Sequence, residues 1–206
     1  MAKERPRAAH LGPEKRRPLV LDAALRLFVE HGYPGTSMDA IAKAAGVSKP
    51  VVYDCYASKE ELFRALLERE EERLLESVAA TMPGDLASED PEEMLCEAWT
   101  ALFEAAAAAP DSWRVIVDSE RVADPAVARR VRRSRQVTAE QLALFLVPLL
   151  ADRGIADAER LGPVYAETLS SIAEAGVRVL LRSGDWEPAE LARVLARSAI
   201  RGPFAS

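Results

Sequence analysis

TSMDAIAKAAGVSKPVVYDCYASKEE, residues 36–61, decides the fold, because it predicts two short helices joined by a tight turn and the start of a third helix. Thr36 and Asp39 have the spacing of a capping box, which places the start of the first helix at about Ser37. Gly46 predicts its end, since glycine adopts the left-handed conformation of a C-terminal cap without a Cβ penalty.

The second short helix is predicted from Ser48 to about Cys55, with Pro50 in its first turn, where a missing amide proton costs nothing. Ser58 and Glu61 repeat the capping-box spacing and open a long helix. Two short helices around a glycine turn are typical of a helix-turn-helix, whose second helix enters the DNA major groove. An ordinary helical hairpin has the same spacing, so the spacing alone leaves both readings open.

A longer run of residues around this pattern is more specific. It consists of Ala23, Ala24, Leu27, Phe28, Gly32, Tyr33, Thr36, Ser37, Ile41, Ala42, Ala45, Gly46, Val47, Ser48, Tyr53, Tyr56, Ser58, Lys59 and Leu62. Over about residues 17–63 the chain resembles the DNA-binding domain of the TetR family of transcriptional regulators. The remainder resembles that family only in its length and helical pattern.

This resemblance implies that the helix of residues 48–55 lies in the major groove. There Lys49 can donate to guanine O6 or N7, and Val51 can contact a thymine methyl. Other residues match positions that bind phosphates or lie near the backbone in the family. The predicted DNA-contacting residues are Arg17, Thr36, Ser37, Ser48, Lys49, Pro50, Val51, Tyr53 and Lys59.

Two residues depart from the family pattern at the end of the recognition helix. Asp54 puts a carboxylate near the DNA backbone, where it should weaken nonspecific affinity unless it pairs with a base or a cation. Cys55 replaces a histidine or aromatic residue. An ordinary buried thiol is the simpler interpretation, and a redox sensor beside DNA would need a depressed pKa.

Charge is distributed unevenly along the 206 residues. The net charge is −6, but residues 1–60 hold 10 Lys plus Arg against 7 Asp plus Glu, and the rest hold 17 against 26. All five lysines lie in the first 60 residues. The helix-turn-helix end is therefore the basic end, as a surface facing phosphates requires.

The composition excludes several classes of protein. No apolar stretch reaches the ~18 residues of a membrane span, and the N-terminus lacks a secretory signal, so we expect a cytoplasmic protein without a membrane partner. Cys55 and Cys96 lie far apart and predict neither a disulfide nor a metal site. No cofactor is indicated.

The predicted fold is all-α, with about nine helices: an N-terminal three-helix head carrying the helix-turn-helix and a C-terminal helical body for ligand binding and dimerisation. We divide the chain into a basic arm (1–13), the helix-turn-helix domain (14–63) and the body (64–206). The arm could reach a minor groove, although a solvated tail is the simpler interpretation. The first helix should begin between Glu14 and Pro18 and end at His31 and Gly32, with residues 33–35 as a loop.

The long helix that opens at Ser58 should run to about Met82, with Leu75 and Val78 among its inward residues. Residues 69–73, with the sequence REEER, form a charge run and are expected on a solvated face. Further helices are predicted at about 90–109, around Trp113, after Asp124 and Pro125, at 157–182 with a kink or restart at Pro163, and at 187–200. The five arginines of residues 129–135 are either a solvated face or a second nucleic-acid patch.

The family resemblance implies a small-molecule pocket in the body and a dimer formed by the last two helices. The candidate pocket residues are Met94, Trp99, Phe103, Trp113, Val117, Phe145 and Tyr165, with Glu97 and Asp118 as polar contacts. The candidate dimer residues are Leu169, Ile172, Ala173, Gly176, Val177, Leu180, Leu191, Val194 and Leu195. For the pocket set, internal core is the simpler interpretation. For the dimer set, internal core explains the apolar faces equally well without the resemblance.

The sequence therefore predicts a homodimeric regulator, most simply a repressor, that binds double-stranded DNA at a palindromic operator and is released by an unknown small-molecule effector. A helix-turn-helix adaptor without an effector is the alternative. An enzyme is disfavoured, because the chain has no metal-spaced cluster, phosphate loop or nucleophile signature and its only histidines are His10 and His31.

Overall fold

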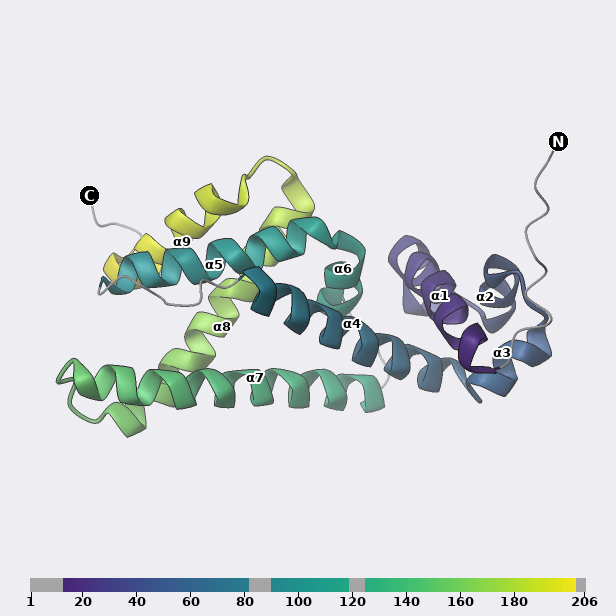
Figure 1. The fold of residues 1–206 in the computed structure, drawn as a ribbon, viewed down its shortest axis with the longest axis horizontal. Coiled ribbons are helices and arrows are strands. Elements are labelled where there is room, and N and C mark those ends of the chain that lie inside the picture. Colours follow the sequence, from purple (N-terminus) through teal and green to yellow (C-terminus); the bar gives the residue numbers. More distant parts are fainter. Residues whose placement is uncertain (1–12, 82–89, 119–124, 203–206) are drawn as a thin grey trace.

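The computed structural model describes residues 13–81, 90–118 and 125–202. Nine helices and no strands occur within these ranges, as the all-α prediction requires. The helices are α1 (Pro13–Gly35), α2 (Met38–Ala45), α3 (Lys49–Cys55), α4 (Lys59–Thr81), α5 (Pro91–Ala108), α6 (Pro110–Asp118), α7 (Pro125–Asp152), α8 (Ala158–Ser183) and α9 (Pro188–Arg201). The molecule is elongated, with α1–α3 at one end, α5–α9 towards the other, and α4 running between them (Figure 1).

The head is built on an apolar stripe of α1. Val20, Ala24 and Phe28 lie on one side of the helix and are buried against Ile41 of α2 and Val52 of α3. Burial of these side chains is the main force holding the short helices, since helices of seven or eight residues are not stable alone in water.

Aromatic rings close the head core where α1, its last turn and α4 meet. Phe28 packs edge-on against Phe63, with ring centroids 4.9 Å apart, and stacks on Tyr33 at 5.7 Å. Such pairs stabilise beyond the area they bury.

The end of α1 differs from the prediction. Gly32 interrupts the helix with φ 70° and ψ 167°, at the predicted end. Residues 33–35 then form a further helical turn, where a loop was expected.

The helix α4 begins as its capping box predicts. The Glu61 amide donates to Ser58 Oγ at 3.1 Å, and the Ala57 amide donates to Glu61 Oε2 at 2.9 Å. Leu62, Leu66 and Leu67 are fully buried. Leu75, also predicted to point inward, is 68% exposed, because α4 has by then left the head core. The side chain of Val78 lies outside the described residues.

The expected solvated charge run on α4 is wrong at one position. Glu70 is 0% exposed, whereas Glu72 is exposed. The reason is that α4 passes α1 on one side and α6 on the other, so the face carrying Glu70 is covered by both.

A second core fills the body. There α5 packs along α9, and α8 crosses between α5 and α7 (Figure 1). Buried members of this core include Trp99, Phe103, Val177 and Leu191. Gly176 of α8 is required by close packing, because a Cβ built there would lie 2.4 Å from Phe103 Cζ and 2.8 Å from Leu195 Cδ1.

The proline of α8 and the arginines of α7 were both singled out by the sequence. α8 is helical throughout Ala158–Ser183, so the predicted restart at Pro163 does not occur. Pro163 lies near the start of the helix, where the missing amide proton removes few of the backbone hydrogen bonds within the helix. Arg129, Arg132 and Arg133 of α7 are exposed, while Arg135 pairs with Glu174 of α8. The predicted cap at Asp124 lies outside the described residues.

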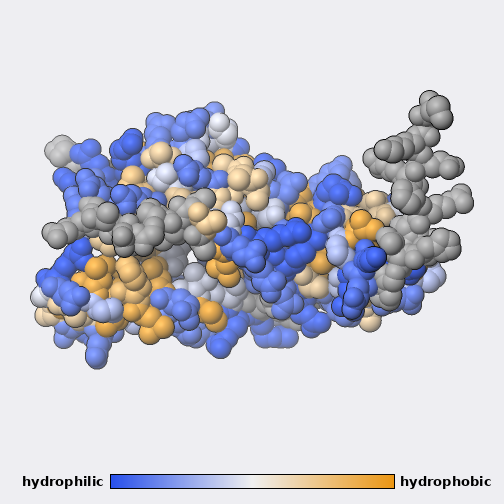
Figure 2. Space-filling view, viewed as in Figure 1, coloured by the Kyte–Doolittle hydropathy of each residue, from blue (hydrophilic) through white to orange (hydrophobic). Residues whose placement is uncertain are grey.

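The surface of the body has an apolar region. Leu144 and Phe145 of α7 and Val164 and Tyr165 of α8 are exposed. Figure 2 shows hydrophobic residues gathered at the lower left, over the part of the molecule where α7 and α8 lie. None of the helices in the described ranges is both long enough and apolar enough to cross a membrane.

Candidate nucleic-acid interface

The first helix of the helix-turn-helix is capped by Ser37, one residue later than expected. Ser37 has extended φ and ψ angles of −111° and 155°, and its Oγ accepts from the Ala40 amide at 3.1 Å. The predicted capping box between Thr36 and Asp39 is therefore wrong. Ser37 remains exposed at the start of α2, where unpaired amides can receive a phosphate.

Thr36 has a different environment from the one predicted. Its side chain is 2% exposed, and Oγ1 lies 2.9 Å from the Gly32 carbonyl oxygen and 3.1 Å from that of Leu27. The hydroxyl thus donates its proton inward, to the carbonyls of Leu27 and Gly32 beside the point where α1 is interrupted. The Thr36 hydroxyl is therefore already engaged in the free protein, and phosphate binding at this position stays a prediction.

The turn between α2 and α3 depends on Gly46. Its φ of 68° and ψ of 28° are left-handed, and the following amide, of Val47, donates to the Ala42 carbonyl at 3.0 Å. These bonds close the end of α2 within one residue. Ser48 then caps α3 through its backbone carbonyl, which accepts from the Val51 amide at 3.0 Å, while its hydroxyl makes no capping bond.

The helix α3 has one buried and one exposed face. Val52 and Cys55 are buried in the head core. Lys49, Pro50, Tyr53 and Asp54 are exposed, and Val51 is half-buried. The predicted contact residues of α3 therefore lie together on the side that is free to meet a duplex.

Lys49 has a partner that the sequence did not reveal. Its Nζ lies 2.8 Å from Asp39 Oδ1 and 3.1 Å from Oδ2, which joins α2 to α3 across the turn. The Nζ also lies 5.9 Å from the centre of the Tyr53 ring. The hydrogen bond to Asp39, and then its negative charge, raise the pKa of Lys49. From its spacing to Thr36, Asp39 was predicted to belong to a cap instead, because a separation of ten residues across a turn predicts no contact.

Lys59 is tied to the backbone of the head. Its Nζ donates to the carbonyls of Tyr33 and Thr36, each at 3.0 Å, and lies 4.3 Å from the centre of the Tyr33 ring. The start of α4 is thereby fastened to the segment between α1 and α2. This contact gives Lys59 a positioning role that the phosphate prediction did not include.

Arg17 lies beside the end of α3. Its guanidinium carbon is 5.5 Å from the centre of the Tyr56 ring. Burial raises the pKa of the Cys55 thiol, against the opposing charges of Arg17 and Arg16. A thiol held protonated is a poor redox sensor, so the environment of Cys55 favours the ordinary buried thiol.

The predicted pocket residues separate into two groups. Trp99 and Phe103 are buried in the body core, and Trp113 and Val117 pack against it. Phe145 and Tyr165 are 49% and 41% exposed on α7 and α8 and do not belong to that cluster, so the structure does not bring them together with the other predicted pocket residues.

The polar and flexible members of the pocket set also lie apart from the aromatic cluster. Met94 is half-buried, and its sulfur accepts from Arg153. Glu97 is exposed, and the Asp118 side chain lies outside the described residues.

Most of the predicted dimer residues are internal. Ala173, Gly176, Val177, Leu180 and Leu191 are buried within the single chain. Leu169, Ile172 and Leu195 pack against the same core, and only Val194 is exposed. The physical reason is that α5 lies along α9 and beside α8 and covers the apolar faces that a partner would have used. In the single chain the buried members of this set are therefore part of the body core, and their role in a dimer stays a prediction.

Within the described residues, no three His, Cys, Asp or Glu side chains gather as a metal site would require.

Comparisons with known proteins agree with the helix-turn-helix geometry. Residues 20–66 match the model of the family described as bacterial regulatory proteins, tetR family. The chain is 35% identical over 126 residues, 61% of its length, to the transcriptional activator FasR of Mycolicibacterium smegmatis, and 43% identical over 53 residues to the transcriptional repressor ComR of Escherichia coli. These matches cover 56% and 25% of the two relatives, so the chain spans about half, or less, of the length of these curated proteins.

A solved structure extends the likeness to the body. A TetR-like transcriptional regulator from Rhodococcus sp. RHA1 superposes with a TM-score of 0.68 at 29% identity, covering 96% of this chain and all of that one. The head motif and these relatives agree: residues 20–66 are a helix-turn-helix domain of the TetR family, and over almost its whole length the chain is similar to a TetR-like transcriptional regulator.

Proposed function

We propose that this regulator is a cytoplasmic homodimer that represses transcription from a palindromic operator and is released when a small molecule binds its body. The observation that carries the proposal is the exposed face of α3, where Lys49, Pro50 and Tyr53 stand beside the capped start of α2. Lysine and tyrosine side chains at the start of a helix supply the donors that base edges and phosphates accept.

A dimer is proposed because one recognition helix reads too few base pairs. Two heads docked in successive major grooves, about 34 Å apart, read a palindrome. The exposed apolar residues of α7 and α8, among them Leu144 and Val164, offer surface for a second copy, since apolar patches on this scale often mark protein contacts.

An effector is proposed on the basis of the aromatic cluster in the body. Trp113 has a buried indole Nε1 for which the described residues provide no hydrogen-bond acceptor, and Trp99 and Phe103 lie in the same core. A buried donor without an acceptor is costly, so an apolar ligand carrying one acceptor would satisfy it. Release then follows from linkage, if the ligand and DNA favour different separations of the heads.

The direction of regulation is proposed on simpler grounds. One relative is named an activator and the other a repressor, so their names support either direction. A homodimer seated on DNA blocks other proteins without any further surface, which makes repression the more economical proposal.

Selection of bound duplexes from a randomised pool tests this function. The purified chain is incubated with the pool at about 150 mM salt, which suppresses weak phosphate contacts. We expect a palindrome with two half-sites. If no sequence is enriched, the proposal that the chain alone binds DNA specifically is refuted.

Variants then separate the roles of the contact residues. Lys49→Ala should relax base preference at one position of each half-site, whereas Tyr53→Phe should weaken binding to all sequences alike. A uniform loss of affinity with an unchanged consensus in the Lys49 variant would contradict base readout by that residue.

The alternative function is a helix-turn-helix adaptor without an effector. Mass spectrometry of small molecules released from the denatured chain, followed by their return to the protein–duplex complex, distinguishes the two. A released compound that lowers duplex affinity supports the ligand-responsive regulator, and affinity that no recovered compound changes supports the adaptor.

A further inference from the structure

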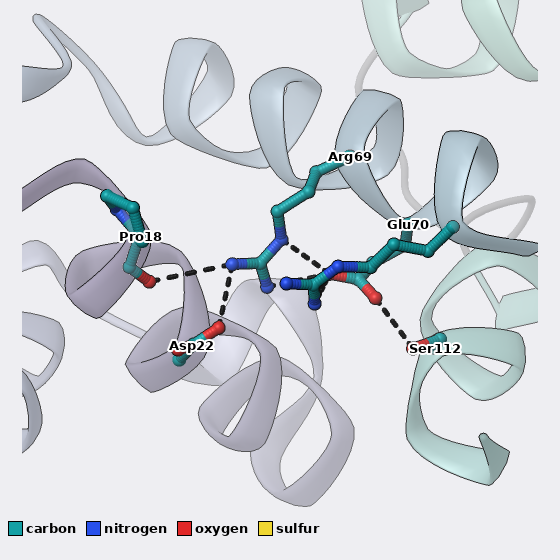
Figure 3. Close-up of polar contacts among 6 residues, drawn as sticks. Pro18, Asp22, Arg69, Glu70 and Ser112 are labelled. Carbon is teal, nitrogen blue, oxygen red and sulfur yellow. Dashed lines mark hydrogen bonds and ion pairs between the residues drawn. The ribbon is translucent and has the colours of Figure 1, made fainter. Parts of the chain in front are cut away.

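A buried carboxylate lies where the head, α4 and the body meet. Glu70 of α4 accepts from the Ser112 hydroxyl of α6 through Oε2 at 2.6 Å, and from Arg69 Nε through Oε1 at 2.7 Å (Figure 3). Arg69 NH2 and Arg73 NH1 lie 2.6 Å and 3.4 Å from the same Oε1. Each oxygen of this buried charge therefore has a donor, as burial requires.

Arg69 continues the network into the head. Its NH1 donates to Asp22 Oδ1 of α1 at 2.7 Å and lies 3.5 Å from the Pro18 carbonyl oxygen. Figure 3 shows the guanidinium between Glu70 and the two α1 residues. A continuous series of polar contacts thus runs from α1 through α4 to the first turn of α6.

Apolar contacts at the same junction hold α6 against the head without fixing the angle between them. Val115 and Ile116 of α6 pack against the head core, but burial of such side chains is non-directional and permits small shifts. Hydrogen bonds weaken steeply when their angles change, and a buried carboxylate that loses a donor is strongly disfavoured. The polar contacts therefore add a directional constraint between α1 and α6 to this apolar packing.

We propose that Glu70 is a positioning residue for DNA binding: through Ser112 on one side and Arg69 on the other, it couples the position of α6 to the orientation of the head. If α6 moves and Ser112 no longer reaches Glu70, the buried Oε2 loses its donor. The Glu70–Arg69 ion pair must then shift, and with it the contact of Arg69 with Asp22 of α1. This inference deepens the proposed function, and it rests on that function for the meaning of head orientation.

The orientation is measured without DNA, by the distance between spin labels at Lys43→Cys in α2 and Arg193→Cys in α9, both exposed positions outside the network. Cys96, which is partly exposed, is replaced by alanine, and Cys55 is buried. Glu70→Gln and Ser112→Ala should shift or broaden the distance distribution. Ser112→Thr, which keeps the hydroxyl, should restore it, and Glu72→Gln, an exposed change on the same helix, should leave it unchanged.

Affinity for the selected duplex gives the second readout. Asp22→Asn and Ser112→Ala, whose side chains are linked through Arg69 and Glu70, should be non-additive in affinity by about threefold or more. If Glu70→Gln fails to fold, the milder Ser112 variants still decide the question.

An unchanged label distance in Ser112→Ala would overturn the coupling, whether or not the chain binds DNA. Failure to select any duplex would refute the proposed function instead, while the label distances remain interpretable. The two failures are therefore distinguishable.

Discussion

The Lys49 ammonium group that DNA binding would use is already paired with the Asp39 carboxylate. In the free protein Asp39 holds its ammonium across the turn, so contact with a base or phosphate requires that pair to open or to widen. Both side chains are exposed, and exposed pairs exchange partners at little cost. Asp39 thus opposes nonspecific binding while leaving Lys49 available to a duplex that offers a better acceptor.

Asp39→Asn should strengthen binding to unrelated duplexes severalfold, because it removes a negative charge and frees Lys49. The slope of log affinity against log salt should steepen by about one, as expected for one more phosphate contact. Fluorescence anisotropy at several salt concentrations measures both. Glu190→Gln, an exposed change on α9, is the matched control, and an equal gain in that variant would assign the effect to net charge alone.

Cys55 should react slowly in the folded protein. Burial raises the pKa of its thiol, so at pH 8 the reactive thiolate is scarcer than in the unfolded chain. Alkylation followed by peptide mass spectrometry should therefore modify the partly exposed Cys96 first, with equal rates in denaturant. Fast modification of Cys55 in the native protein would restore the redox-sensor interpretation.

At the scale of elements, the helix-turn-helix depends on how sharply α2 ends. The left-handed Gly46 and the Ser48 cap leave one residue between them, and this sets the direction in which α3 departs. A Cβ built on Gly46 would have no neighbour within 4 Å, so a substitution there changes backbone strain without creating a clash.

Gly46→Ala should lower the free energy of unfolding by about 1–2 kcal/mol, the cost of a left-handed residue with a Cβ. Gly46→Asn should cost less, since asparagine tolerates this conformation. Urea denaturation measures both. Gly35→Ala is the control, because Gly35 lacks a positive φ and its Cβ would lie 3.4 Å from His31 Cβ. Equal losses at positions 35 and 46 would argue against backbone strain.

At the scale of the whole molecule, the head core and the body core share one helix, α6. Val115 of α6 belongs to the head core, whereas Trp113, two residues earlier, packs against the body core. A displacement of α6 would therefore change the packing of both the head core and the body core. A ligand-dependent regulator needs such a connection between its two parts.

The body core also determines which surfaces remain for a partner. Leu180→Ala should lower the free energy of unfolding by about 2–5 kcal/mol, the usual cost of truncating a core leucine, and leave the oligomeric state unchanged. Val194→Ala, an exposed position of α9, should cost little. Denaturation and sedimentation velocity measure the two properties. A dissociated but equally stable Leu180 variant would restore the predicted interface.

Local features could be predicted from the sequence because their causes are local. The turn at Gly46, the cap at Ser58 and the apolar stripe of α1 each follow from residues within one or two helical turns, and the structure contains all three. The error at Thr36 arose where two adjacent hydroxyls competed for one cap. Packing against α1 decided it, because Thr36 found carbonyls nine and four residues back to receive its proton.

The sequence by itself determined an all-helical chain with a helix-turn-helix near its basic end, since helix periodicity, caps and glycine turns act over a few residues. Only the tertiary structure decided which helix faces meet. It turned Glu70 from an apparently solvated residue into a buried link between α1 and α6, and it placed Leu180 inside the chain. A helix face is apolar or charged in sequence, but its neighbour depends on how distant helices cross, and no local pattern encodes that.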